Sequence, residues 1–202
     1  MAHEGLWEQL LELDVQKTAR RAKCRYLTDP GHYAITLLNT AYTVDPSDKR
    51  ILSGQPDSKA PEAGFLEQLC ILVYLIKAQD LPLADKLVRA EALPGGQFFF
   101  RGLHRLPTGK LEEAFGERPE LLYQAAKKLG AKRCEFGDAS IELYVLPRIP
   151  LTVVLWGADE EFGARASLLF DQTAAAQLPL DALLTAVNLT VDALVSACAA
   201  SN

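Results

Sequence analysis

Residues 147–171 contain the feature that most constrains the fold: two apolar runs separated by a short acidic loop. The runs occupy residues 151–156 and 166–170, and the loop lies at residues 159–161. Short β-rich runs bounded by glycine and proline predict a pair of β-strands. Because both runs are apolar on both faces, we expect them in the middle of a sheet that helices cover on at least one side.

Further strands are predicted where apolar and polar residues alternate. They occupy residues 33–38, 41–44, 132–136 and 141–146. Asn39-Thr40 and Gly137-Asp138 are suited to the two hairpin turns that would join them in pairs. Residues 45–61, rich in proline, glycine and small polar residues, predict a surface loop with a short strand at residues 50–52.

Helical periodicity accounts for much of the remaining chain. The helices are expected at residues 4–25, 61–79, 108–116 and 119–130, and from residue 179 onward. Asp29-Pro30-Gly31 is expected to end the first helix, and Thr108 to cap the third. Residues 69–76 are apolar nearly all round, so the second helix should cross the centre of the protein.

Strands that are grouped along the chain, rather than alternating with helices, indicate the α+β class. We expect an antiparallel sheet of about four to six strands, covered by N-terminal, central and C-terminal helices. The 202 residues are expected to form a single domain. In this interpretation residues 1–60 supply a helix and a hairpin, and residues 61–202 supply the core.

Charge and composition exclude several classes of function. A formal net charge of −5 provides no extended positive field for nucleic acid, and the basic residues at 17–25 are interpreted as a solvated face. The longest uncharged apolar stretch, residues 69–76, is too short to cross a bilayer, and the N-terminus has no targeting pattern, so we expect a cytoplasmic protein. None of the four cysteines is in a C-x-x-C pair, which favours structural thiols and no metal site.

Several motifs, taken together, resemble a bacterial family known as domain of unknown function 3786. They are Leu93-Pro-Gly-Gly96 with the aromatic run after it, Leu111 to Gly116, Pro147-Arg-Ile-Pro150, Val154-Leu-Trp156, Asp159-Glu-Glu-Phe162 and Ser167-Leu-Leu-Phe-Asp171. The resemblance covers about residues 64–195. It implies a prokaryotic, often anaerobic, source and no established activity. Some relatives have an added cysteine-rich iron–sulfur segment, which this chain lacks.

The first candidate site is the glycine- and aromatic-rich segment at residues 95–105. Glycine permits close approach of a ligand, phenylalanine offers stacking surface, and arginine or histidine can hold an anionic group. The candidate ligand-binding residues are Gly95, Gly96, Phe98, Phe100, Arg101, His104 and Arg105. A buried edge strand, with Phe98 and Phe100 on one face, explains the phenylalanines equally well.

The second candidate site is the acidic loop Asp159, Glu160 and Glu161. Neighbouring carboxylates can bind a hard cation or act as a general acid or base, although a solvated hairpin loop is often simply acidic. Asp171 should lie about 20 Å from the loop, at the other end of its strand, and is interpreted as a helix cap. Trp156 is expected in the core.

The sequence has no nucleophile–base pair and no phosphate-binding loop. We therefore expect a non-catalytic module of anaerobic bacterial metabolism that binds a small anionic or aromatic ligand or cofactor, or a partner protein. The first alternative is a metal-assisted or acid/base hydrolase-like enzyme that uses residues 159–161. The second is a structural assembly subunit. The identity of the ligand or cofactor and the oligomeric state are left open.

Overall fold

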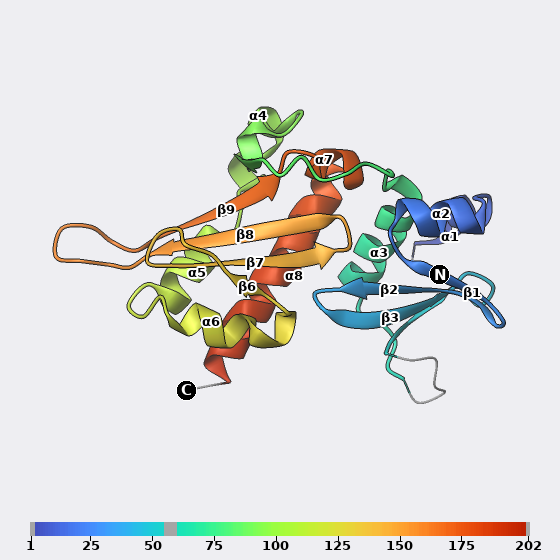
Figure 1. Ribbon diagram of the computed structural model, residues 1–202, viewed down its shortest axis with the longest axis horizontal. Helices are drawn as coiled ribbons and strands as arrows, with labels where there is room; N and C mark the ends of the chain where they lie inside the picture. Colours follow the sequence, from blue (N-terminus) through green and yellow to red (C-terminus); the bar gives the residue numbers. More distant parts are fainter. Residues whose placement is uncertain (1–2, 55–59, 201–202) are drawn as a thin grey trace.

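The computed structural model describes residues 3–54 and 60–200, which form two antiparallel β-sheets beside a central pair of packed helices (Figure 1). The α+β class is confirmed. The strands are divided between a four-stranded N-terminal sheet and a five-stranded C-terminal sheet instead of lying in one sheet. Residues 55–59 of the predicted surface loop lie outside the described residues.

The N-terminal helical region is two helices, α1 (Glu4–Leu11) and α2 (Val15–Arg21), so the prediction of one helix over residues 4–25 is wrong. The break has a local cause. The Asp14 carboxylate accepts a hydrogen bond from the main-chain N–H of Lys17 at 2.8 Å, which starts a new helix at Val15.

The N-terminal sheet consists of four strands that pair in chain order. They are β1 (Arg25–Thr28), β2 (Gly31–Leu37), β3 (Thr40–Asp45) and β4 (Arg50–Ser53). Asp29 and Pro30 form the turn between β1 and β2 and do not end a helix, as had been expected. The hairpin predicted at residues 33–44 is confirmed, but its turn residues are Leu38 and Asn39, one position earlier than expected, because Leu37 pairs with Thr40.

Helix α3 (Phe65–Lys77) confirms the predicted central helix, although it begins four residues after the expected start. Its first turn is closed by the Glu67 carboxylate, which accepts from the Gly64 N–H at 2.7 Å. Helix α3 packs against α1, α2 and the long C-terminal helix α8 (Leu180–Ala199). Burial on these several sides explains its nearly uniform apolar composition.

Residues 78–130, between α3 and β6, form short elements, of which β5 belongs to the C-terminal sheet. They are β5 (Leu87–Arg89), η1 (Ala90–Ala92), α4 (Gly96–Phe99), η2 (Gly102–His104), α5 (Thr108–Phe115), α6 (Leu121–Ala125) and η3 (Ala126–Leu129). The helix predicted at residues 108–116 is confirmed, whereas the one predicted at residues 119–130 is a short α-helix, α6, followed by the 3-10 turn η3. Thr108 is the first residue of α5 and Pro107 occupies the N-cap position, so the prediction that Thr108 caps this helix is wrong.

The C-terminal sheet has the strand order β5-β9-β8-β7-β6, so β8 lies in the middle as predicted. Its remaining strands are β6 (Lys132–Arg133), β7 (Ala139–Leu146), β8 (Ile149–Trp156) and β9 (Arg165–Asp171), and α7 (Ala174–Gln177) follows them. Helices α5, α6 and α8 pack against this sheet, with α8 crossing behind it in Figure 1. Residues 151–155 of β8 are all buried.

Helix α8 is long and apolar enough to cross a membrane by length and composition alone. Half of its apolar window is buried inside the protein, where it packs against α3, α5 and α6. The core helix of a globular protein has the same composition, so its position accounts for its hydropathy.

Candidate ligand-binding site

The segment at residues 95–105 is helical, so the edge-strand interpretation is wrong. Gly95 adopts the left-handed conformation, with φ of 77°, and starts α4. A Cβ atom at Gly96 would lie 1.9 Å from the main-chain oxygen of Ala90. The absence of a side chain at Gly96 therefore lets the main chain of η1 approach closely, and not a ligand as predicted.

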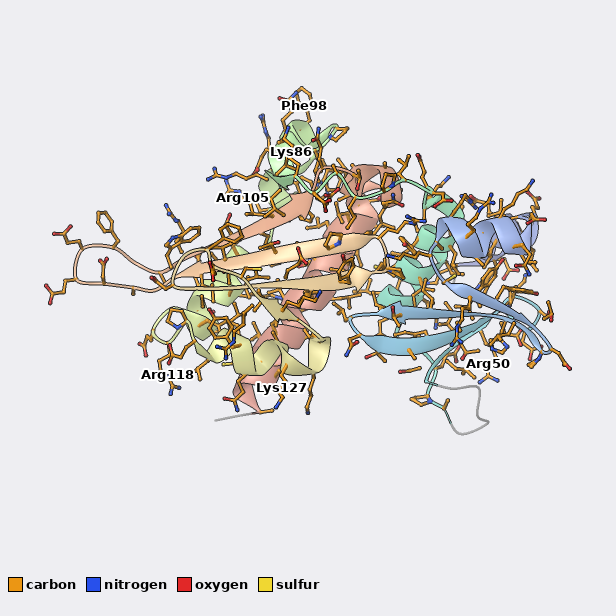
Figure 2. The ribbon with its side chains drawn as sticks, in the orientation of Figure 1. Arg50, Lys86, Phe98, Arg105, Arg118 and Lys127 are labelled. Atoms are coloured by element: carbon orange, nitrogen blue, oxygen red, sulfur yellow. The ribbon has the colours of Figure 1, made fainter. Side chains whose placement is uncertain are left out.

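The three phenylalanines of this segment have different environments. Phe98 is 74% exposed, whereas Phe100 is 5% exposed, so the two do not share a face as strand alternation had predicted. Phe99 is half-buried and stacks on the His104 ring, with centroids 4.5 Å apart and planes at 5°. In Figure 2 Phe98 points away from the protein at the tip of the segment.

A cavity of about 490 Å³ lies at the inner side of this segment, beside the edge of β9. It is lined by Arg89, Ala90, Glu91, Phe100, Arg105, Leu106, Thr108, Trp156, Arg165, Ala166, Ser167 and Leu168. Of the seven ligand-binding candidates, the structure brings only Phe100 and Arg105 into the cavity. Gly95, Gly96, Phe98, Arg101 and His104 lie on the same segment but do not line it.

Strand pairing explains where the cavity forms. The short strand β5 pairs only with residues 169–171 of β9, after which the chain turns into η1. Residues 165–168 of β9 pair with β8 on one side and have no described strand on the other. The main-chain N–H of Ala166 on this edge donates to the Glu112 carboxylate at 3.0 Å, and residues 165–168 form a wall of the cavity.

Three arginines from three separate elements line the cavity. Arg89 ends β5, Arg105 follows η2, and Arg165 begins β9. Arg165 is the cross-strand partner of Trp156, and its guanidinium carbon lies 4.6 Å from the centroid of the indole ring. In the part of the chain that the structure describes, none of the three arginines is in an ion pair within 4.0 Å.

Trp156 is partly exposed at the end of β8, so the prediction that it belongs to the core is wrong. The indole ring closes one side of the cavity under the Arg165 guanidinium. Arg89, Glu91, Trp156 and Arg165 were all missed as site residues. The predicted pairing of residues 151–156 with 166–170 was a usable signal, because it already put Trp156 beside the start of the next strand.

The acidic loop projects from the end of the C-terminal sheet, between β8 and β9 (Figure 1). The Asp159 carboxylate accepts from the main-chain N–H groups of Phe162 and Glu161, at 2.7 Å and 2.9 Å, and these bonds lower the pKa of Asp159. Asp159 therefore shapes the turn, while Glu160 and Glu161 are exposed. Among the described residues, no group of three or more His, Cys, Asp or Glu side chains is placed to hold a metal ion.

Asp171 lies at the opposite end of β9 from the acidic loop and is 3% exposed. Its carboxylate accepts from the N–H groups of Ala84 and Thr173, at 3.1 Å and 2.9 Å, and from the Thr173 hydroxyl. Burial raises the pKa of Asp171, but these hydrogen bonds outweigh burial and hold the pKa below its usual value. The prediction that Asp171 is a helix cap is wrong, because Thr173 occupies the N-cap position of α7. Asp171 does accept main-chain N–H groups, but it does so in the turn before the helix.

Comparison with known proteins identifies one family. The model of a family described as a domain of unknown function (DUF3786) matches residues 14–193. The match confirms the resemblance and begins well before residue 64, so the N-terminal sheet is part of the family domain and not an addition to it. No curated protein and no solved structure matches the chain.

Proposed function

We propose that this chain, which belongs to the DUF3786 family, is a non-catalytic module that binds a small organic anion in the cavity between η1, η2 and β9. The observation that carries the proposal is the set of three arginines, Arg89, Arg105 and Arg165, around one cavity that contains a single carboxylate, Glu91. The lining of this cavity is therefore positively charged, although the protein as a whole has a net charge of −5.

The chemistry of the lining favours an anion with an aromatic or apolar part. A guanidinium is a planar fork of donors that matches carboxylate and phosphate groups bidentately. Because the three arginines have no described ion-pair partner, their donors are available to a ligand. Trp156 and Phe100 add flat apolar surface on which a ring can stack.

Several observations support binding over catalysis at this site. The described lining has two hydroxyl side chains, Thr108 and Ser167, no histidine, and one carboxylate, Glu91, which is hydrogen-bonded to neither hydroxyl. A serine or threonine nucleophile needs an adjacent base. In the acidic loop, Asp159 is committed to the turn, which weakens the hydrolase-like alternative.

A protein partner is the second candidate, and it rests on a different observation. Phe98 and Leu103 are 74% and 101% exposed on the protruding segment next to the cavity. Exposed aromatic and aliphatic side chains next to arginines are typical of protein interfaces. A partner that inserts an acidic side chain into the cavity would use both surfaces.

We further propose a cytoplasmic setting. All four cysteines are unpaired, and disulfides are rare in reducing compartments. The connection with anaerobic bacterial metabolism rests on the family resemblance alone.

The proposal is tested by calorimetric titration with phenyl phosphate, inorganic phosphate and benzyl alcohol. Phenyl phosphate should bind most tightly, because only it combines the anionic group with a ring. Arg165→Ala should weaken this binding by about tenfold or more, the cost of losing a charge-assisted hydrogen bond. Lys86→Ala is the matched control, since Lys86 is a nearby exposed cation that does not line the cavity.

Equal weakening by the two substitutions would show only a general effect of charge and would overturn the site. Native mass spectrometry of protein purified from its source is the second readout. A retained mass that Arg105→Ala removes supports the proposal and reports the mass of the ligand.

A further inference from the structure

A second cavity of about 450 Å³ is lined by residues between 19 and 54 and by Pro147, and shares no residue with the first. It is bounded by the α2–β1 junction, one face of the N-terminal sheet and the turn between β7 and β8. The lining residues are Ala19, Arg20, Lys23, Cys24, Arg25, Leu27, His32, Ala34, Ile35, Thr36, Ala41, Tyr42, Thr43, Gly54 and Pro147.

Strand register explains the composition of the cavity floor. Ala34 pairs with Thr43 and Thr36 pairs with Ala41, so four small side chains lie on one face of β2 and β3. The opposite face carries the large buried side chains of the core, among them Tyr33. Small residues in the centre of a sheet face leave a hollow, which Leu27 borders on β1.

His32 provides the most specific evidence for a ligand. Its side chain lines this cavity and is 4% exposed. The Nδ1 atom is buried and has no hydrogen-bond partner among the described residues. An unpaired buried polar atom costs about 1–3 kcal/mol, so such atoms are retained where something else pairs with them.

The rim of the cavity is positively charged. Arg20, Lys23 and Arg25 line it, and the described lining contains no carboxylate. Arg20 is already paired with Asp80 at 3.7 Å, outside the cavity, whereas Lys23 and Arg25 have no described ion-pair partner. These cations belong to the basic run that the sequence analysis interpreted as a solvated face.

Cys24 contributes an apolar wall and not a reactive group. Burial raises the pKa of the Cys24 thiol to about 12, so the thiol stays protonated at neutral pH. A protonated thiol is neither a good nucleophile nor a metal ligand. His32 also has no second histidine or carboxylate beside it in the described lining, which argues against a metal.

We propose that this second cavity binds an amphiphilic organic anion, with its apolar body on the floor formed by β2 and β3 and its charged head at Lys23, Arg25 and His32. The apolar floor alone would accept a neutral lipid, and the cations alone would accept an inorganic ion. The buried, unpaired Nδ1 of His32 favours a ligand that reaches below the rim and presents a hydrogen-bonding group there.

The test is calorimetric titration of the intact chain with three probes at submillimolar concentration: decanoate, decanol and acetate. Decanoate should bind, and decanol and acetate should bind about tenfold more weakly or not at all, because each lacks one of the two parts. Equal binding of decanol would overturn the role of the charged rim. No binding of decanoate would overturn the proposal.

Substitutions then locate the decanoate. His32→Leu removes the unpaired polar atom, so it should leave the fold stable while weakening decanoate binding about tenfold. Lys23→Ala with Arg25→Ala should do the same, and Lys17→Ala, in the same basic run but outside the cavity, should not. If Arg165→Ala abolished decanoate binding while these lining substitutions had no effect, the ligand would lie in the first cavity and the second site would be wrong.

Discussion

The Nε of Arg148 donates a hydrogen bond to the main-chain oxygen of Arg21 at 2.7 Å, while the guanidinium of Arg21 donates to the main-chain oxygen of Ala78 at 2.9 Å. Arg148 lies in the turn between β7 and β8, so the two arginines tie the end of α2 to the C-terminal sheet and to the segment after α3. Arg148 also pairs with Asp80 and donates to the main-chain oxygen of Leu81. Arg148 therefore connects the C-terminal sheet to α2 and to the segment after α3.

Arg148→Ala is expected to destabilise the protein by about 2–4 kcal/mol, because it leaves several carbonyl groups and Asp80 without their shared donor. Its side chain is only 14% exposed, so water replaces these bonds poorly. Chemical denaturation measures the effect. Arg20→Ala, which removes a 71%-exposed partner of the same Asp80, should cost less than about 1 kcal/mol. A similar loss in both variants would contradict the bridging role of Arg148.

Trp156 should report binding in the first cavity by fluorescence. The chain has two tryptophans, and Trp7 is fully buried in the core, away from the cavity lining. Phenyl phosphate is therefore expected to change the emission of the intact protein and to protect it from acrylamide quenching. Trp156→Phe should retain the Trp7 emission and lose the response. A response that persists in Trp156→Phe would place the ligand elsewhere.

Asp171 should make stability depend on pH in the acid range. Its pKa is lowered in the folded state, so it contributes stability above its unfolded value of about 3.8, and that stability is lost as pH falls through the folded pKa. Asp171→Ala should cost about 1–3 kcal/mol at neutral pH, since buried N–H groups lose their acceptor. The free energy of unfolding, measured by denaturation between neutral and strongly acid pH, should therefore change less with pH in this variant than in the unmodified protein. Glu160→Gln, in the exposed loop, should leave the curve unchanged.

Gly96→Ala should be severely destabilising, because the new methyl group would meet the Ala90 carbonyl oxygen at 1.9 Å. Relief requires η1 and α4 to separate, which would also disturb the cavity wall. The matched control is Gly109→Ala in α5, where nothing lies within 4 Å of the new methyl group. That change should be neutral or stabilise by up to about 1 kcal/mol through helix propensity. Thermal unfolding of both variants distinguishes the two effects.

The elements that sequence reasoning located well are those whose burial repeats regularly along the chain. The pair at 151–156 and 166–170, the central helix and the C-terminal helix all have one face or both faces in the core over many residues, so their periodicity is visible locally. The errors fall at short segments. Asp14 breaks the first helix through one side-chain bond, and residues 96–104 form two short helical turns whose phenylalanines mimic strand alternation.

The candidate site was predicted only in part. Phe100 and Arg105 line the cavity, whereas Arg101 and His104, equally suitable by residue type, do not. Which of these side chains face the cavity depends on where the short helical segments α4 and η2 begin and end. Neighbouring residues of similar chemistry do not reveal those positions in the sequence. The sequence did not identify Arg89 and Glu91 as site residues. They line the cavity because β5 is short and pairs with only three residues of β9.

The sequence by itself determined the α+β class, the antiparallel pairing around β8, the core helices and the family, because these depend on patterns that repeat within single segments. Only the tertiary structure decided that the strands form two sheets, that three arginines distant in sequence line one cavity with Trp156, and that His32 is buried in a second cavity with a basic rim. The physical reason is that a cavity forms where neighbouring helices and strands do not fill the space between them. That position is set by the lengths and edges of elements far apart in the chain, which no local pattern of residues records.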